Sequence, residues 1–278
     1  MHDRNAVNIY RFDMGHPPEA LLESSRWDDN PHLSPDGRRI TFESRRGGEG
    51  AEIWLAAPDG SNPMQLTHGP GIWQGSPRWS PDGQRIAFDS RAEDGQFDIW
   101  TIDADGGPPR RLTLDPGNEE IPSWSRDGHW IYFMSDRAGA REVWRIPATG
   151  GTEERVTQGG GTLAYESVDG KTLFFTRASA NAALFALPLD GGPERKLVEC
   201  VPTMGFAVGP GGVYHLGCTA DLGAVPLHLL DPATGRDRLL GKLEQAFLGL
   251  TVSPDGKTIL YTKLENQGTE LMMIENFR

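Results

Sequence analysis

Hydrophobic and polar positions alternate over short segments of this chain. Residues 40–44 (Ile-Thr-Phe-Glu-Ser), 86–90 (Ile-Ala-Phe-Asp-Ser) and 131–135 (Ile-Tyr-Phe-Met-Ser) share one alternating pattern. An apolar period of two is typical of a β-strand, whereas a helix needs a period near 3.6. No stretch sustains the helical period. We therefore predict an all-β protein with essentially no helix.

The strand pattern repeats along the chain. An Asp-Gly pair recurs at intervals of 42 to 46 residues, and Gly211-Gly212 fills the one missing place. Asp and Gly at these places predict tight turns between paired strands, because Gly supplies the positive φ angles that such turns require. A second Gly-rich turn follows later in each period. The turn aspartates are Asp36, Asp82, Asp127, Asp169 and Asp255.

Each period holds four strand signals, which we call a to d. Four short antiparallel strands in about 44 residues are typical of a propeller blade. We predict a single domain, residues 1–278, that forms a six-bladed β-propeller of four-stranded antiparallel blades closed by N- and C-terminal strands. The a–b pairs begin near residues 32, 77, 122, 163, 206 and 248.

The two ends of the chain share the last blade. Its c strand is predicted at residues 271–277, and no d strand follows. Residues 19–23 are predicted to supply that strand, because closure of the ring removes open sheet edges. One c-like segment, residues 8–13, is then left over. It lies outside the ring, or it belongs to a blade whose a–b pair lay upstream in a longer protein.

The repeated phrase resembles a known family. Ser-Pro-Asp-Gly-(Arg/Lys)-x-Ile-x-Phe, followed by Ile-Trp and Arg-Leu-Thr, is similar to the TolB-like, WD40-like propeller repeat. The resemblance is strong over the first three blades and the last a–b pair, and weaker over residues 163–240. It extends to the C-terminal propeller of bacterial winged-helix transcriptional regulators and Ser/Thr kinases, which implies a signalling protein. Propellers host many activities, so the resemblance specifies the fold more than the function.

The composition and net charge of the chain limit the kinds of partner that it can bind. The 278 residues carry 27 Lys and Arg against 39 Asp and Glu, a formal net charge of −12. Nucleic-acid binding needs a basic surface, so we predict no nucleic-acid partner. No apolar run approaches the length of a membrane span, and the polar N-terminus is no signal peptide. We predict no membrane contact and a cytoplasmic chain, or an extracytoplasmic one if it was cut from a membrane-anchored protein.

Motifs for catalysis and for metal binding are missing. The chain has no Gly-x-Ser-x-Gly and no His-Glu-x-x-His, and its seven histidines show no ligand spacing. Cys200 and Cys218 are predicted to be buried free thiols. The turn aspartates recur in the blades, which favours a structural role. The same reasoning assigns inter-blade hydrogen bonds to Arg45, Arg91, Arg137 and Arg177.

The d–a and b–c loops vary between blades and lie at one end of the central channel. They carry carboxylates, two tryptophans and arginines, and such convergence in a concavity predicts a binding site. The alternative is a solvated acidic rim. The candidate ligand-binding residues are Trp27, Asp28, Asp29, Arg45, Trp73, Gln74, Arg91, Glu119, Glu120 and Arg137.

The four carboxylates in that set also suggest a cation. Calcium prefers oxygen ligands, so Asp28, Asp29, Glu119 and Glu120 are the candidate ligands of a channel-bound calcium ion. Arginines in the b–c loops would neutralise the same charges and remove the need for an ion. No other cofactor is predicted.

We predict that the chain functions as a non-catalytic binding or sensor module. We predict that it holds a protein, a peptide or a small polar molecule on the d–a and b–c loop face. One alternative is a propeller lyase or hydrolase that uses a channel-bound cation. Another is a scaffold propeller that gates a peptidase. The missing nucleophile motif and the scattered histidines favour binding over catalysis.

Overall fold

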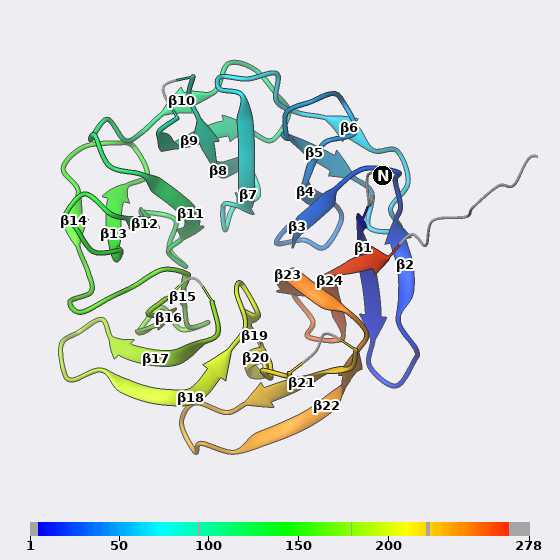
Figure 1. Ribbon diagram of the computed structural model, residues 1–278. Coiled ribbons are helices and arrows are strands. Elements are labelled where there is room, and N and C mark those ends of the chain that lie inside the picture. The colour runs from blue at the N-terminus through cyan, green and yellow to red at the C-terminus, as the bar shows by residue number, and fades with distance from the viewer. Residues whose placement is uncertain (1–4, 94, 179, 221–222, 267–278) are drawn as a thin grey trace, which may run out of the picture.

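The computed structural model describes residues 5–93, 95–178, 180–220 and 223–266. Their strands form six four-stranded antiparallel sheets that stand in a ring around a central axis (Figure 1). The prediction of an all-β, six-bladed propeller is confirmed. No helix among the described residues is long and apolar enough to cross a membrane.

Blades are numbered in chain order, with strand a innermost and strand d outermost. Blade one is β3 (Asp28–Leu33), β4 (Ile40–Ser44), β5 (Glu52–Ala56) and β6 (Met64–Gln65). Blade two is β7 (Trp73–Trp79), β8 (Arg85–Arg91), β9 (Phe97–Asp103) and β10 (Arg110–Arg111). Blade three is β11 (Glu119–Trp124), β12 (Trp130–Ser135), β13 (Glu142–Pro147) and β14 (Glu154–Arg155).

The remaining blades follow the same order until the chain ends meet. Blade four is β15 (Ala164–Glu166), β16 (Thr172–Thr176), β17 (Ala182–Pro188) and β18 (Arg195–Val201). Blade five is β19 (Phe206–Gly209), β20 (Gly212–Leu216), β21 (Val225–Leu230) and β22 (Asp237–Leu243). Blade six is β23 (Ala246–Val252), β24 (Thr258–Asn266), β1 (Asn5–Asp13) and β2 (Glu19–Leu22).

The N-terminal segment supplies two strands of blade six, where the sequence predicted one. β1 takes the c position because it pairs with β24 over nine residues, from Asn5↔Asn266 to Asp13↔Thr258, and β2 follows as the outer strand. The c strand predicted at residues 271–277 is therefore a wrong assignment. That segment lies outside the described residues. The c-like segment 8–13 is inside the ring, in blade six. Both predictions for it, a place outside the ring and membership of a further blade from a longer protein, are therefore wrong.

The a–b turns have the structure that their sequence predicts. Asp82 Oδ1 accepts hydrogen bonds from Ser80 Oγ (2.5 Å) and from the backbone N–H of Gln84 (3.0 Å), and Gly83 has a φ of 69°. The other Asp-Gly turns repeat the Ser–Asp bond. The aspartates therefore serve the turn, which confirms their structural role.

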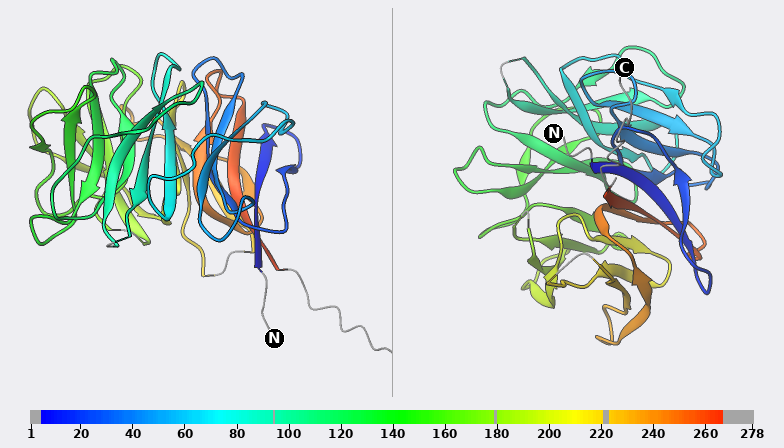
Figure 2. Two further views of the ribbon diagram at one scale, coloured as in Figure 1. Left: turned by 90° about the horizontal axis from the view of Figure 1, so that it is seen from above. Right: turned by 45° about the vertical axis from the view of Figure 1, so that its right-hand side comes forward.

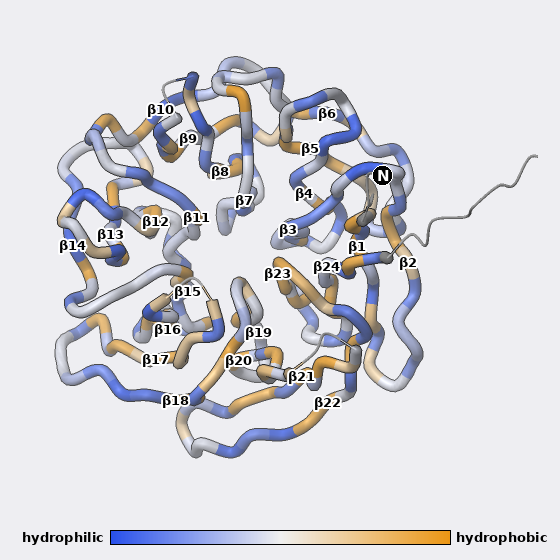
Figure 3. The backbone as a smooth tube through the Cα atoms, in the orientation of Figure 1, coloured by the Kyte–Doolittle hydropathy of each residue, from blue (hydrophilic) through white to orange (hydrophobic). Residues whose placement is uncertain are grey.

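The hydrophobic core lies between neighbouring blades. Ile53 and Leu55 of blade one pack with Ile86 and Phe88 of blade two in one buried cluster, and similar clusters follow around the ring. Tryptophans of the a strands add inter-blade hydrogen bonds, such as Trp79 Nε1 to the His32 carbonyl (3.2 Å). The strands cross the thickness of the disc (Figure 2), and outer strands such as β10 and β14 are polar (Figure 3).

Strand a of the first three blades begins three or four residues before the predicted starts, at Asp28, Trp73 and Glu119. The sequence obscured this start because each strand contains a β-bulge directly before its proline, at Asn30 (φ 49°), Ser76 (φ 51°) and Ile121 (φ 58°). A bulge interrupts the alternation that identifies a strand. Residues assigned to the d–a loops therefore belong to the innermost strands.

Cys200 and Cys218 form a disulfide that joins β18 of blade four to the segment after β20 of blade five. The prediction of buried free thiols is wrong in both respects, since both residues are partly exposed. Their Cα atoms lie 5.8 Å apart, a normal separation for this bond. No sequence pattern indicated this pairing, because it depends on how two blades face each other.

Candidate functional site

The central channel has two different ends. We call the end with the a–b turns the turn end, and the end with the d–a and b–c loops the loop end. A cavity of about 420 Å³ lies at the turn end, lined by the innermost strands of all six blades and by turn residues such as Pro35, Pro81 and Pro254. This cavity is at the opposite end from the predicted site residues.

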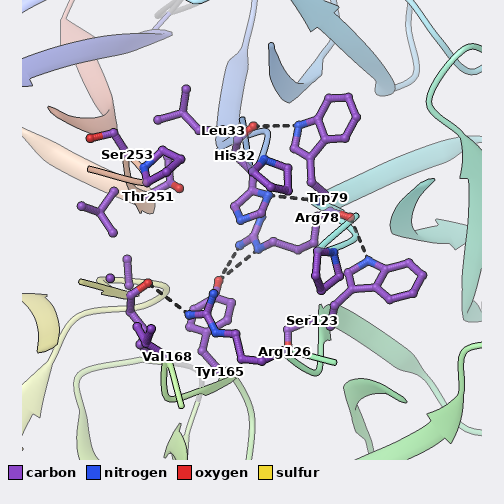
Figure 4. A pocket seen from close by; sticks show the side chains of 18 of the residues that line it. His32, Leu33, Arg78, Trp79, Ser123, Arg126, Tyr165, Val168, Thr251 and Ser253 are labelled. Carbon is purple, nitrogen blue, oxygen red and sulfur yellow. Dashed lines mark hydrogen bonds between the residues drawn. The ribbon is translucent and has the colours of Figure 1, made fainter. Parts of the chain in front are cut away.

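Arg78 of β7 forms part of the cavity wall. Its side chain is 3% exposed, and its Nε and Nη2 donate to Tyr165 Oη of blade four at 3.1 and 2.7 Å (Figure 4). Its Nη1 donates to the Pro77 carbonyl at 2.8 Å. Among the described residues, no carboxylate forms an ion pair with Arg78. Burial raises the pKa of Asp89, and Arg78 lies close enough to oppose this rise, but Asp89 forms no ion pair with the guanidinium. A buried guanidinium without an ion-pair partner favours the arrival of an anion.

A second arginine, Arg126, lies at the cavity mouth. It is exposed, and its guanidinium donates only to the backbone carbonyls of Ser167 (3.3 Å), Glu166 (3.3 Å) and Val208 (3.4 Å). Glu166 Oε2 accepts the backbone N–H of Arg126 at 2.7 Å, while Oε1 accepts from Tyr132 Oη at 2.6 Å. The Glu166 carboxylate is thus held by other donors.

The remaining walls are apolar or neutral. Trp79, Trp124 and Val208 present aromatic and aliphatic surface to the cavity. His32 is neutral, because burial, followed by the charges of Arg78 and Arg126, holds its pKa well below the usual range. The turn end is therefore a positively charged pocket with apolar walls.

Three of the predicted site residues serve the blades themselves. Asp28 accepts from Ser44 Oγ (2.5 Å) and pairs with Arg46, and Glu119 accepts from Ser135 Oγ (2.8 Å). Gln74 accepts from Ser90 Oγ at 2.6 Å in the equivalent place of blade two. All three predicted residues are fully buried. Each joins the start of strand a to the end of strand b, a structural role.

The neighbouring carboxylates Asp29 and Glu120 face a different environment. Burial raises the pKa of Asp29 to about 7, opposed by Arg45, and burial with the nearby charge of Asp89 raises the pKa of Glu120 to about 7. Asp29 Oδ1 is buried without a hydrogen-bond partner. These groups gain protons near neutral pH, which the sequence did not indicate.

Two further buried carboxylates lie nearby. A Cβ atom on Gly75 would meet both Asp89 Oδ1 (2.8 Å) and Glu43 Oε2 (2.9 Å). Burial raises the pKa of each of these two groups, and for Glu43 the charges of Asp29 and Asp89 act in the same direction. Asp89 Oδ2 accepts the bulge N–H of Ile121 at 2.9 Å. The loop end is therefore rich in buried carboxylates.

Trp27, Arg45 and Trp73 do come together at the loop end. The Arg45 guanidinium lies 4.7 Å from the ring centre of Trp27 and 4.2 Å from that of Trp73. Trp27 also meets Phe247 of blade six edge to face, with ring centres 6.2 Å apart. A cation between two aromatic faces is a favourable contact, so the predicted anchors are partly engaged with one another.

Arg91 and Arg137 point elsewhere. Arg91 donates to the Gly95 carbonyl (3.3 Å) in its own loop. Arg137 is turned toward the outer strands, where it pairs with Asp115 (2.6 Å) and Glu119 (3.1 Å) and lies over Trp144. It follows its serine by two residues, whereas Arg45 and Arg91 follow theirs by one. One residue reverses the side on which a side chain projects.

The four predicted calcium ligands do not form a compact group. Among the described residues, one set of three or more His, Cys, Asp or Glu has ligand atoms within 4.8 Å of one another: His215, His228 and Asp237 of blade five. Sequence spacing missed this set, because its members lie on three successive strands and meet through strand pairing. Calcium at the loop end stays a prediction.

Six radial sheets around a central cavity define a β-propeller. The chain belongs to the TolB beta propeller family, because the model of the TolB beta propeller domain matches residues 70–216, more than half of its length. The family resemblance of the Ser-Pro-Asp-Gly repeat is thus confirmed.

Individual relatives are more distant. The uncharacterized protein Atu1656 of Agrobacterium fabrum is 36% identical over 76 residues, which cover 27% of this chain and 25% of that protein. TolB from Acinetobacter baumannii is similar with a TM-score of 0.68 and 20% identity, over 96% of this chain and 65% of that one. The chain therefore spans a quarter of the first protein's length and less than two thirds of the second's.

An enzyme is among the similar structures too. Oligogalacturonate lyase from Vibrio parahaemolyticus has a TM-score of 0.61 and 14% identity, over 90% of this chain and 76% of that chain. At such identities the likeness concerns the fold alone. The function of this chain has to be argued from its own channel.

Proposed function

We propose that this protein is a non-catalytic binding module that holds an acidic peptide segment in the cavity at its turn end. The observation that supports this is Arg78, a buried guanidinium whose partners are a phenol and a backbone carbonyl. Arg126 adds a second cation at the mouth. A carboxylate that entered the cavity would replace weak neutral acceptors with a charge-assisted, two-point contact.

The size and walls of the cavity suit a peptide. A volume of about 420 Å³ is within the usual range of ligand pockets, and its surface combines apolar walls with a few polar groups. Trp79, Trp124 and Val208 would cover aliphatic parts of the segment. A polyanion such as nucleic acid fits less well, since the chain as a whole carries a net charge of −12.

The absence of catalysis is part of the proposal. His32 is the histidine of the cavity lining, and its Nδ1 accepts the backbone N–H of Trp79 at 3.0 Å. A nitrogen that accepts this bond is not free to activate a hydroxyl group. The role in bacterial signalling or regulation is supported by the resemblance of the repeat to propellers of bacterial regulators and kinases.

The loop end is a second candidate surface. The stack of Arg45 between Trp27 and Trp73 offers aromatic area and a charge beside the channel, and Trp and Arg are the usual anchors of protein interfaces. A partner protein or a small polar molecule would dock there across the d–a and b–c loops. Binding at the turn end requires Arg126, whereas binding at the loop end requires Arg45.

A selection from a random peptide library on the immobilised protein tests the proposal. Selected peptides are then titrated by calorimetry against the wild type, Arg126→Gln, Arg45→Gln and Arg236→Gln. Arg236 lies at an exposed β21–β22 turn away from the cavity and serves as the matched control. We expect peptides rich in Asp and Glu, and a loss of about tenfold or more with Arg126→Gln, the value of one charge-assisted hydrogen bond.

Three results contradict this assignment. Peptides that depend on Arg45 and not on Arg126 would move the site to the loop end. Selection of lysine-rich peptides would refute an acidic ligand. So would a selection that yields no peptides beyond those that bind the support without protein. Arg78→Gln is a confirmatory variant only if its melting curve matches that of the wild type, because Arg78 is buried.

A further inference from the structure

Three side chains on neighbouring strands of blade five converge on one point. They are His215 on β20, His228 on β21 and Asp237 on β22, with ligand atoms within 4.8 Å of one another. His215 Nε2 lies 3.4 Å from Asp237 Oδ1, and His228 Nδ1 lies 3.3 Å from Asp237 Oδ2. The carboxylate thus bridges the two imidazole nitrogens.

Strand pairing creates this group. His215 lies directly opposite His228, and their rings stack with centres 5.1 Å apart. Asp237 lies opposite Leu230, which is two residues beyond His228 and therefore on the same side of the sheet. Val213 and Leu230 share that side and belong to the buried cluster between blades four and five. The group faces blade four.

The imidazole nitrogens that face the carboxylate lie at ion-pair distance from it and have no closer hydrogen bond among the described residues. His215 is 3% exposed, and its Nδ1 lies 3.4 Å from the Leu216 carbonyl, which accepts the ring proton in the tautomer that leaves Nε2 able to coordinate. Nε2 then carries a lone pair. In the described structure, neither this nitrogen nor His228 Nδ1 has a hydrogen-bond partner. A lone pair that faces a carboxylate is costly to bury unless a proton or a cation lies between the two.

We propose that His215, His228 and Asp237 bind a divalent transition-metal ion of the zinc type. Tetrahedral zinc with bonds of about 2.0–2.1 Å places neighbouring ligand atoms about 3.3–3.4 Å apart. The 3.4 Å between His215 Nε2 and Asp237 Oδ1 matches this geometry, and His228 Nδ1 lies 3.3 Å from the other oxygen, Oδ2, of the same carboxylate. Two imidazoles favour zinc over calcium or magnesium, which prefer oxygen ligands.

The surroundings fit a metal site as well. The Leu216 carbonyl beside His215 Nδ1 is the outer partner that orients a ligating histidine. His228 and Asp237 have side chains that are 26% and 38% exposed, so an ion can enter and solvent can fill a fourth position. The ion would tie three strands of blade five together, close to the Cys200–Cys218 disulfide.

Zinc binding to the oxidised protein tests this proposal. The protein is prepared without a histidine tag, stripped with chelator and titrated with zinc by calorimetry, with the metal content measured after dialysis. We expect one zinc ion per chain and a rise in Tm with zinc. His228→Gln and Asp237→Asn should weaken binding about a hundredfold or more, beyond the effect of losing an outer-shell partner. Asp237 is exposed, so its variant should fold.

His129→Gln is the matched control. His129 Nδ1 pairs with Asp127 Oδ2 at 3.0 Å on the surface, a His–Asp pair that lies outside the three-ligand group. This variant should bind zinc as the wild type does. Zinc that binds equally to Asp237→Asn, or that depends on His129, would overturn the proposal. So would zinc that binds only after reduction, since it would belong to Cys200 and Cys218.

Discussion

The two ends of the channel differ in charge and in available space. The turn end has the cavity, two arginines without an ion pair in the described structure, and apolar walls. The loop end has buried carboxylates, of which Asp29 and Glu120 have pKa values raised to about 7. Its aromatic and cationic groups are stacked on each other.

The difference shows that segments whose sequence varies between blades need not be the segments that line an open cavity. The segments before strand a vary between blades, yet Asp28, Gln74 and Glu119 in them are buried in the innermost strands and bonded to the serine of the next strand. The a–b turns repeat, and the cavity lies at their end of the molecule. A binding surface should be sought where a charged side chain has only neutral hydrogen-bond partners, as Arg78 has in Tyr165 and the Pro77 carbonyl.

Both ends depend on a closed ring, so opening the ring should have the largest effect. Deletion of residues 1–24 removes β1 and β2 and exposes the apolar side of β24, including Ile259 and Tyr261. We expect a loss of more than about 5 kcal/mol, beyond the range of single substitutions, and loss of cooperative melting. A peptide of residues 1–24 added in trans should restore it. An unchanged melting curve would contradict closure by these strands.

Raising the pH should destabilise the loop end. The folded pKa values of Asp29 and Glu120, about 7, exceed the usual 3.8 and 4.5, so the folded state holds protons that the unfolded chain releases. Stability from these groups is present at low pH and is lost as the pH rises through 7. Each carboxylate contributes up to about 1.4 kcal/mol per pH unit while it titrates.

Urea unfolding between pH 6.5 and 8.5 measures this effect. The buried histidines His32 and His215 act in the opposite direction at the lower edge of this window, because the unfolded chain binds protons near the usual pKa of 6.5 and their lowered folded pKa values prevent this in the folded state. All the variants keep both histidines, so this contribution cancels when their slopes are compared with that of the wild type. Asp29→Asn and Glu120→Gln should each flatten the slope. Asp127→Asn is the control, because a hydrogen bond from Ser125 helps to lower the pKa of Asp127 to about 2. Equal slopes in all four proteins would refute the raised values.

The sequence predicted the fold well because the fold depends on local turns. Asp-Gly and Gly-Gly pairs require tight turns wherever they stand, and the alternation between them sets the strands. Bulges at Asn30, Ser76 and Ile121 broke that alternation and hid the starts of the a strands. The N-terminal c strand was misplaced because residues 8–13 and 271–277 carry similar patterns, and pairing partners decide between them.

The candidate site was harder to predict from the sequence than the fold, because it depends on contacts between blades. Contacts between blades decide which polar group is satisfied, and no local pattern records them. Arg78 reaches Tyr165, 87 residues away, and Asp89 accepts a bond from the next blade. The Cys200–Cys218 disulfide and the His215–His228 pair depend on the register of strands that the sequence places only approximately.

The turns of the turn end should affect stability and leave binding unchanged. Asp82→Ala removes two hydrogen bonds from its turn, and we expect a loss of about 1–2 kcal/mol in the free energy of unfolding. Asp82 does not line the cavity, so peptides selected on the wild type should bind the variant within about twofold.

Trp73→Ala at the loop end should also leave the affinity for these peptides unchanged. Loss of affinity with Trp73→Ala alone would favour the loop end, where its anchors would each contribute about 1–3 kcal/mol.

Calcium should produce the smallest effect. Arg46 pairs with Asp28 and Arg137 with Glu119, whose pKa burial still raises to about 7, so a cation at the loop end would rely on Asp29 and Glu120 with Glu43 and Asp89 nearby. We expect a slight rise in Tm with calcium at pH 8, where more of these carboxylates are ionised, and none at pH 6. Asp29→Asn should abolish the rise, whereas Asp237→Asn, which removes an oxygen ligand from blade five, should leave it intact. Identical melting curves in chelator and in calcium at pH 8 would show that protons and arginines alone balance the charge at this end.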